Sequence, residues 1–463
     1  MSEPSLQDRF HLIGVGGAGM SVVAELLVSR GAVVAGSDRE ESQVLDHLRS
    51  VGVRVDVGHD ASHVDPEAVV VVSSAIREDN PELAVARRRG QLVIHRSQAL
   101  ALAASGMRFV AMAGAHGKTS TSGMLAIALR ACGLDPSVAV GGVLPQLGTG
   151  AHLGGGEVFV AEADESDGSF LNYSPAIEIV TNVEPDHLDR YHSREEFEEI
   201  FVEFVRRLVP GGLLVACAED PGAARLADTA KSLGARVVTY GREEHSQCEA
   251  DVLICDVSVD AEGASASLAW GPRRARLRLA VPGEHHVLNA AAAWVAGIEC
   301  GVEPQAMADG LGTYAGAARR FESRGAVGGR RLFDDYAHHP TEVEAAIEQA
   351  RVVAAGGEVT VVFQPHLYSR TRIFAERFAS ALSRADHVVL AGIYGAREDP
   401  EPGVDSGMIA SRVVGASYAE DMHEAARRAA RLTPRGGVCV TMGAGSITRC
   451  GQDVLDEWKR MDS

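Results

Sequence analysis

The stretch that decides the fold is Phe109-Val110-Ala111-Met112-Ala113-Gly114-Ala115-His116-Gly117-Lys118-Thr119-Ser120. An apolar strand runs into a glycine-rich turn, and the apolar residues after Gly123 predict a helix. Glycines let backbone N–H groups turn towards a phosphate, Lys118 reaches the terminal phosphates, and the Thr119 hydroxyl can bind Mg²⁺. The strict pattern needs Gly at position 112, where Met112 stands. The stretch therefore predicts a strand–loop–helix unit that binds a nucleoside triphosphate.

Short apolar runs alternate with helical stretches on both sides of this unit. Nearly continuous Val/Ile/Leu runs are typical of parallel strands buried on both faces, and their alternation with helices predicts α/β domains with mostly parallel sheets. The runs are Phe10–Val15, Val69–Ser73, Phe109–Ala113, Val158–Ala161, Ile177–Thr181, Leu213–Cys217, Val359–Phe363, His387–Leu390 and Val438–Met442.

A second glycine-rich turn lies near the N-terminus. The strand Phe10–Ile13 enters Gly14-Val15-Gly16-Gly17-Ala18-Gly19-Met20-Ser21, which fits the G-x-G-x-x-G pattern, and Asp38 ends the next strand. This pattern is typical of NAD-binding domains, but its physical content is only that a pyrophosphate can sit on a helix N-terminus. The turn predicts a Rossmann-like domain, with NAD or another nucleotide as its ligand and Asp38 as either a ligand contact or a solvated turn residue.

We expect three domains. A new strand–loop–helix unit starts at Arg108, and a stretch rich in Gly, Ala and Arg lies near Gly310–Phe321. The predicted domains are a Rossmann-like N-terminal domain at 1–106, a central ATPase of the phosphate-loop type at 107–316 and a Rossmann-like C-terminal domain at 317–463. The alternating stretch Val252–Leu279 predicts a small antiparallel patch within the central domain.

Composition narrows the class of protein. The 463 residues carry a net charge of −19, from 44 basic and 63 acidic residues, which argues against a nucleic-acid partner. The seven cysteines include no C-x-x-C pair, which fits a reducing compartment. The first residues lack the apolar core of a signal peptide, and no apolar run reaches the roughly 18 residues of a membrane span. We therefore expect a cytoplasmic protein without membrane insertion.

Carboxylates follow the strand that ends at Ala161. The residues Glu162-Ala163-Asp164-Glu165-Ser166-Asp167 place four acids within six positions, at the carboxyl end of a strand where ligands of such sheets bind. Carboxylate oxygens suit Mg²⁺. The next strand leads into Asn182-Val183-Glu184-Pro185-Asp186-His187-Leu188-Asp189.

The Gly-x-His-Gly-Lys-Thr loop and this Asn-x-x-x-Asp-His-x-Asp segment resemble motifs of the Mur ligase family, which uses ATP to join a carboxylate to an amine. The resemblance implies that Thr119, Glu162 and His187 hold magnesium, with Glu165 as the rival to Glu162. Residues Ser193–Val205 contain no Lys, where related ligases carry a carbamylated Lys, so the second metal's protein ligand stays open. The ATP-binding loop implied is Gly114, Ala115, His116, Gly117, Lys118, Thr119 and Ser120.

The N-terminal glycine turn resembles the same family's first domain, which binds a UDP-sugar and no nicotinamide. Val71–Ile76 and Arg96 also fit its sugar-nucleotide side. The UDP-sugar contacts that this resemblance implies are Gly16, Gly17, Gly19, Met20, Asp38, Ser73, Ser74 and Arg96.

The C-terminal part carries further matches to the family. The resemblance implies that Asn289 contacts adenine, Arg320 contacts the γ-phosphate, and Asp334 or Asp335 meets the ribose. In Asp334-Asp335-Tyr336-Ala337-His338-His339-Pro340, it places Tyr336 and His338 near the amino acid. Independently, Arg370 and Arg372 are suited to bind the carboxylate of an amino acid by paired hydrogen bonds.

The implied activity is ATP-dependent joining of L-alanine to the carboxylate of UDP-N-acetylmuramate through an acyl phosphate, in peptidoglycan synthesis. Lys118, His187, Arg320 and His338 are the implied catalytic residues; the partners are the small substrates UDP-N-acetylmuramate, L-alanine and ATP, with Mg²⁺. We expect a monomer or homodimer. Three alternatives stay open: a tripeptide ligase acting on the same UDP-sugar, an NAD-dependent oxidoreductase and a non-catalytic ATP-binding switch.

Overall fold

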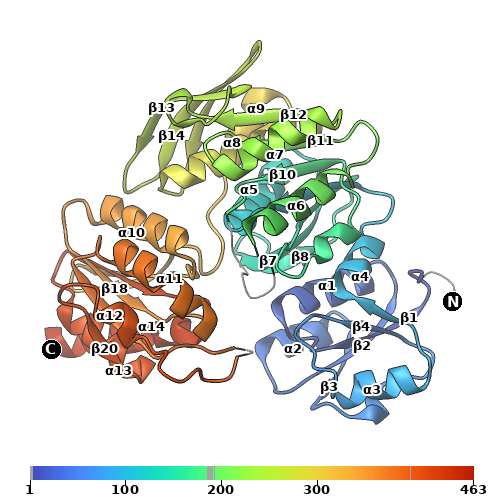
Figure 1. The fold of residues 1–463 in the computed structure, drawn as a ribbon, viewed down its shortest axis with the longest axis horizontal. Coiled ribbons are helices and arrows are strands. Elements are labelled where there is room, and N and C mark those ends of the chain that lie inside the picture. Colours follow the sequence, from blue (N-terminus) through green and yellow to red (C-terminus); the bar gives the residue numbers. More distant parts are fainter. Residues whose placement is uncertain (1–3, 185–190, 192, 397) are drawn as a thin grey trace. The chain divides into compact units, whose positions relative to one another are not determined.

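The computed structural model describes residues 4–184, 191, 193–396 and 398–463 (Figure 1). Its contacts define two compact units. The first comprises Met1–Cys255, Ser267–Leu277 and Leu288–Tyr314, and the second comprises Asp256–Ala266, Arg278–Val287 and Ala315–Ser463. Three mostly parallel sheets carry helices on their faces, so the predicted α/β class is confirmed. No helix within the described ranges is long and apolar enough to cross a membrane.

The N-terminal sheet has five parallel strands in the order β3-β2-β1-β4-β5. This order places the turn after β1 beside the turn after β4, and Gly14 accordingly lies against Ile76. The strands are β1 (Arg9–Ile13), β2 (Val33–Asp38), β3 (Arg54–Val57), β4 (Val69–Val72) and β5 (Val93–His95). The helices are α1 (Ala18–Ser29), α2 (Gln43–Ser50), α3 (Pro81–Arg88) and α4 (Arg96–Ala103), with the short 3₁₀ turn η1 (Ala61–His63).

The central sheet has ten strands in the order β15-β14-β13-β12-β11-β10-β6-β9-β7-β8. The strands are β6 (Arg108–Ala113), β7 (Ser137–Leu144), β8 (Thr149–His152), β9 (Val158–Glu162), β10 (Ile177–Val180), β11 (Leu213–Cys217), β12 (Arg236–Gly241), β13 (Val252–Val259), β14 (Ala264–Trp270) and β15 (Arg273–Leu279). The helices are α5 (Lys118–Ala131), α6 (Arg194–Val205), α7 (Pro221–Ser232), α8 (Glu284–Glu299) and α9 (Pro304–Leu311), with η2 (Ser169–Asn172) and η3 (Glu243–His245). Strand β6 lies between β9 and β10 and is parallel to both. The loops that follow these three strands therefore lie at the same end of the sheet, at the carboxyl ends of the strands.

The C-terminal sheet has six strands in the order β16-β17-β21-β18-β19-β20, with only β16 antiparallel to its neighbour among the described pairings. The strands are β16 (Glu322–Val327), β17 (Arg330–Asp335), β18 (Val359–Phe363), β19 (His387–Ala391), β20 (Ser417–Ala419) and β21 (Val438–Met442). The helices are α10 (Pro340–Ala354), α11 (Tyr368–Leu382), α12 (Gly407–Ala410), α13 (Met422–Leu432) and α14 (Gly451–Asp462), with η4 (Ser446–Cys450). Four buried alanines of α13 let this helix approach the sheet closely, and the Trp458 indole of α14 donates to Ala430 O at 3.0 Å.

All nine apolar runs form strands, with ends that differ by at most two residues from those predicted. The first run ends early, at Ile13, because Gly14 takes a left-handed conformation with φ +76°. The predicted patch Val252–Leu279 forms β13, β14 and β15, three neighbouring strands at one edge of the central sheet.

One acid of the central sheet is fully buried between apolar neighbours on the adjacent strands. Glu178 of β10 is fully buried and lies between Ala111 of β6 and Leu214 of β11. Neither of its carboxyl oxygens has a hydrogen-bond partner within the described part of the chain. Burial raises the pKa of this carboxyl well above its ordinary value, because an apolar environment disfavours the charged form. The folded chain therefore favours protonated Glu178.

Two substitutions at Glu178 test this assignment. The folded chain keeps a proton that the unfolded chain releases above about pH 4.5, so the free energy of unfolding should fall as the pH rises from there. Glu178→Gln cannot release a proton and should flatten this dependence. Glu178→Met also removes the unpaired polar group, and should be more stable than Glu178→Gln by about 1–3 kcal/mol.

The measurement is chemical unfolding of the three proteins across about pH 5 to 8, which lies above the pKa of this carboxyl in the unfolded chain. Parallel curves for the parent chain and Glu178→Gln would contradict a protonated Glu178.

Candidate functional site

The loop between β6 and α5 requires glycine at two positions. Gly114 has φ +129° and Gly117 has φ +85°, which side-chain-bearing residues rarely adopt. A Cβ at Gly114 would also collide with Thr181 Oγ1, and one at Gly117 would lie 3.1 Å from Asn289 Oδ1. The predicted adenine contact Asn289 therefore lies directly beside the predicted phosphate loop.

Residues at the end of β10 hold the loop in place. Thr181 Oγ1 donates to His116 O at 2.6 Å, and Asn182 Nδ2 donates to the same carbonyl at 2.9 Å. The His116 N–H donates in return to Asn182 Oδ1 at 3.1 Å. Thr181 and Asn182 are both buried. Asn182 belongs to the motif recognised in the sequence, but the role of Thr181 had no sequence signal beyond its place at a strand end.

Lys118 is paired with an acid from the segment that follows the neighbouring strand β9. Its ammonium lies 2.8 Å and 3.0 Å from the two oxygens of Glu165 and also donates to Gly114 O. The side chains are 16% and 1% exposed. Burial raises the pKa of Glu165 to about 7, against the effect of Lys118. For Lys118 burial opposes the charged form, yet the carboxylates of Glu165, Asp164 and Glu162 raise its pKa.

The predicted metal-binding groups lie around this pair. Thr119 is buried at the start of α5, and Glu162, at the end of β9, accepts a hydrogen bond from the Gly141 N–H at 2.9 Å. Hydroxyl and carboxylate oxygens are the donors that Mg²⁺ prefers, so Thr119, Glu162 and Glu165 fit that ion by their chemistry. The third predicted ligand, His187, lies outside the described residues.

Arg96 connects the first glycine loop to this acidic segment within the first unit. A Cβ at Gly19 would lie 2.9 Å from Arg96 Nη1, and Arg96 Nη2 lies 3.6 Å from Asp164 Oδ2. The neighbouring residue His95 lies 3.3 Å from Asp167 through Nε2. One arginine thus joins the N-terminal glycine loop to the acidic segment after β9.

Asp38 and Ser73, which were predicted to contact the UDP-sugar, accept hydrogen bonds from backbone N–H groups of the protein. Asp38 accepts hydrogen bonds from the Gly16 N–H at 2.8 Å and the Arg39 N–H at 2.7 Å, so both carboxylate oxygens bind backbone. The backbone carbonyl of Ser73 accepts from the Ile76 N–H in the turn after β4, and Ser74 is exposed in that turn. Gly16, Gly17 and Met20 lie at the start of α1 or just before it.

The two aspartates at the end of β17 are buried and bound to protein donors. Asp334 accepts from Thr441 Oγ1 at 2.6 Å and Thr448 Oγ1 at 2.7 Å. Asp335 accepts from the backbone N–H groups of Phe321 and Ala337 at 2.8 and 2.7 Å. Burial raises the pKa of Asp335 to about 6, with Arg320 opposing the shift. These bonds fix the turn that presents Tyr336 and His338.

Arg320, Tyr336 and His338 form one cluster around Glu342. Arg320 Nη1 lies 3.6 Å from Glu342, and His338 Nδ1 lies 3.1 Å from the same carboxylate. The guanidinium of Arg320 lies 5.1 Å from the Tyr336 ring centroid. Although Glu342 is buried, His338 and Arg320 hold its pKa well below the ordinary value. The signal for Glu342 is its place three residues after His339, as the third residue of α10 in a capping box.

The two arginines of α11 lie in different surroundings. Arg370 is 5% exposed, and its Nη1 lies 3.5 Å from His366 Nδ1, whose ring is 5.8 Å from that of His338. Arg372 is 51% exposed and forms an ion pair with Glu401 at 3.0 Å. Residues two apart on a helix do not face each other. The structure thus joins Arg370, but not Arg372, to the His338 cluster, and His366 is a member that the sequence did not single out.

Comparisons with known proteins identify all three parts of the chain. Residues 9–108 match the model described as Mur ligase family, catalytic domain; residues 112–297 match the Mur ligase middle domain; and residues 319–445 match the Mur ligase, glutamate ligase domain.

Full-length relatives agree with these matches. The UDP-N-acetylmuramate–L-alanine ligase of Kineococcus radiotolerans is 52% identical, covering 97% of this chain and 96% of that protein. The ligase of the same name from Renibacterium salmoninarum is 49% identical, covering 97% and 95%.

Two solved structures are similar throughout. The UDP-N-acetylmuramate-alanine ligase of Thermotoga maritima has 28% identity and a TM-score of 0.80, over 98% of this chain and 100% of that one. A murein peptide ligase from Psychrobacter arcticus, at 23% identity and a TM-score of 0.72 over 97% and 98% of the chains, shares the fold. The chain therefore belongs to the Mur ligase family.

Proposed function

We propose that this chain joins L-alanine to the carboxylate of UDP-N-acetylmuramate with hydrolysis of ATP, in the cytoplasmic stage of peptidoglycan synthesis. The observation that carries the proposal is the buried Lys118–Glu165 pair at the glycine loop, in a chain 52% identical to a protein named for this reaction. The three predicted domains, at 1–106, 107–316 and 317–463, remain part of the proposal, as does a monomeric or homodimeric state.

The first step is proposed at the loop of the first unit. The carboxylate of the UDP-sugar attacks the γ-phosphate of ATP, which gives an acyl phosphate and ADP. Backbone N–H groups of Gly114–Ser120 and the Lys118 ammonium bind the phosphates, and Lys118 exchanges its Glu165 partner for them. Positioning and charge stabilisation account for most of the catalysis in phosphoryl transfer.

Magnesium supplies positive charge next to the phosphates when it is bound. Thr119 with Glu162 or Glu165 would hold it, since their oxygens match its preference. The chain's own contribution at this point is the set of oxygens and the start of α5, which carries Thr119.

The second step needs an amine held as a nucleophile. The L-alanine nitrogen attacks the acyl carbon, phosphate leaves, and the nitrogen loses a proton. Arg320 is assigned to the phosphate and Arg370 to the carboxylate of L-alanine, because guanidinium groups bind such oxygens in pairs. His338, held by Glu342 at 3.1 Å, or a nearby carboxylate accepts the proton.

The alternatives are distinguishable by what they turn over. An NAD-dependent oxidoreductase gives no role to Lys118, and the carboxylate of Asp38 is already bound to the Gly16 and Arg39 N–H groups. An ATP-binding switch predicts hydrolysis that does not respond to amino acids. A tripeptide ligase predicts turnover with a murein tripeptide rather than with a single amino acid.

Phosphate release with MgATP and UDP-N-acetylmuramate separates these possibilities. We expect release only when L-alanine is added, and no response to a murein tripeptide or NADH. With heavy oxygen in the UDP-sugar carboxylate, one labelled oxygen should appear in the released phosphate, because the acyl phosphate breaks between carbon and that oxygen. Release of unlabelled phosphate only would rule out the acyl-phosphate route.

Lys118→Ala should lower kcat by about 10²–10³-fold or more, since the charge that stabilises the transferring phosphoryl group is lost. Lys231→Ala is the matched control, because Lys231 is exposed on α7. The assay is L-alanine-dependent phosphate release, with circular dichroism to confirm folding. Full activity of folded Lys118→Ala would contradict the loop assignment.

Arg370→Ala and Arg372→Ala should differ in their response to L-alanine. Loss of hydrogen bonds from a buried guanidinium to a carboxylate should raise the KM for L-alanine about 10–100-fold in Arg370→Ala. Arg372→Ala should change it less than about 3-fold, because an exposed ion pair contributes little. Steady-state kinetics at saturating ATP and UDP-sugar measure both, and equal effects would remove Arg370 from the amino-acid site.

A further inference from the structure

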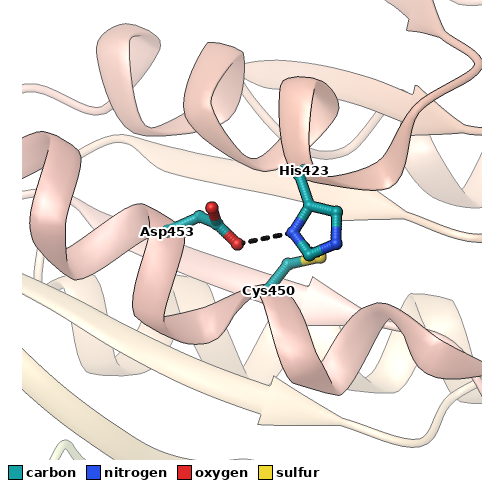
Figure 2. Close-up of side chains that lie close together, drawn as sticks. All are labelled: His423, Cys450 and Asp453. Carbon is teal, nitrogen blue, oxygen red and sulfur yellow. Dashed lines mark hydrogen bonds and ion pairs between the residues drawn. The ribbon is translucent and has the colours of Figure 1, made fainter.

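Three side chains with different metal-binding atoms meet in the second unit, and none of them is assigned a role above. Figure 2 shows His423 of α13, Cys450 at the end of η4 and Asp453 of α14 pointing towards one another. His423 Nδ1 lies 2.8 Å from Asp453 Oδ2 and 3.7 Å from Cys450 Sγ, and all three ligand atoms lie within 4.8 Å of one another. Among the described residues, no other set of three His, Cys, Asp or Glu side chains meets this criterion.

The distances between the ligand atoms of His423, Cys450 and Asp453 suit one shared metal ion rather than a proton relay. In a tetrahedral site with zinc–ligand bonds of about 2.0–2.3 Å, ligand atoms lie about 3.3–3.6 Å apart. The two distances from His423 Nδ1 bracket that range, so a shift of about half an ångström at Asp453 reaches it. A relay would use the two ring nitrogens on two different partners, whereas here a single nitrogen faces both the thiol and the carboxylate.

The surroundings orient the carboxylate and leave one side open. The second oxygen of Asp453 lies 3.4 Å from Arg427 Nη1, and such outer contacts fix ligand orientation in metal sites. Arg427 also lies 3.4 Å from Glu424, which offsets its charge. Cys450 is fully buried, while the His423 side chain is 44% exposed. Three protein ligands and one open side for water is a common zinc arrangement.

We infer that His423, Cys450 and Asp453 form a binding site for a borderline-soft divalent metal ion, with Zn²⁺ the best fit. Imidazole, thiolate and one carboxylate match Zn²⁺, whereas Mg²⁺ prefers oxygen ligands alone. The ion would tie the start of α13 to η4 and α14. The segment η4 follows the loop whose Gly443 and Gly445 carbonyls accept hydrogen bonds from Arg319. The inference does not rest on the proposed ligase activity, since none of the three residues is assigned to a substrate.

The test uses Co²⁺ as a spectroscopic substitute for Zn²⁺ in the full-length chain. Bound metal is first removed with a chelator, and the thiols are kept reduced with a reductant that does not bind metal ions. We expect one equivalent of Co²⁺ to bind with intense tetrahedral d–d bands and a thiolate charge-transfer band, and Zn²⁺ to displace it. Excess Mg²⁺ should not displace it. The melting temperature should rise with added Zn²⁺.

Two variants and one control test the ligands. Cys450→Ser should lose the charge-transfer band, and Asp453→Asn should keep that band but bind Co²⁺ at least about 10-fold more weakly. Cys255→Ser is the matched control, because Cys255 is an exposed cysteine elsewhere in the chain, and it should behave like the parent. An unchanged charge-transfer band in Cys450→Ser would overturn the site, as would its absence from the parent. If Cys450→Ser does not fold, unchanged affinity in Asp453→Asn would overturn it.

Discussion

The buried ion pair between Lys118 and Glu165 is the interaction on which the proposed active site depends. The ammonium group of Lys118, the first residue of α5, is largely buried at the carboxyl end of β6. An unpaired charge there would be strongly destabilising. Glu165, which follows the neighbouring strand β9, supplies the opposite charge at 2.8 Å. The pair keeps a positive group poised at the glycine loop, which is the property that phosphoryl transfer from ATP requires.

The backbone around this pair is held by hydrogen bonds within the protein. Gly114 and Gly117 adopt left-handed conformations, and Thr181 and Asn182 hold the His116 carbonyl from the next strand. Arg96, the first residue of α4, adds a contact to Asp164 within the same unit. Such preorganisation matters because an electrostatic catalyst loses effect if its groups must rearrange during the reaction.

The C-terminal cluster of Arg320, Tyr336, His338 and Glu342 is also held by contacts within the protein. Asp334 accepts hydrogen bonds from Thr441 and Thr448, and Asp335 accepts them from the Phe321 and Ala337 N–H groups. The turn that follows these aspartates carries His338, which shares the Glu342 carboxylate with Arg320. The motif Asp334–Pro340 was visible in the sequence because it combines rare residue types in a short span. Glu342 and His366 were not singled out, because their roles arise from neighbours on α10 and in the turn before α11 rather than from an unusual local pattern.

The sequence by itself determined the α/β class, the nine apolar strands and the two glycine loops, because strand periodicity and turn chemistry depend on residues close together in the chain. It did not predict the paired strands β7 and β8, where Gly141, Gly142 and Gly150 interrupt the apolar pattern. Only the tertiary structure decided that Lys118 pairs with Glu165, 47 residues away, and that Thr181 holds His116, 65 residues away. Those partners were set by the order of strands in the sheet, since β6 lies between β9 and β10. Strand order is a property of packing that no short stretch of sequence encodes.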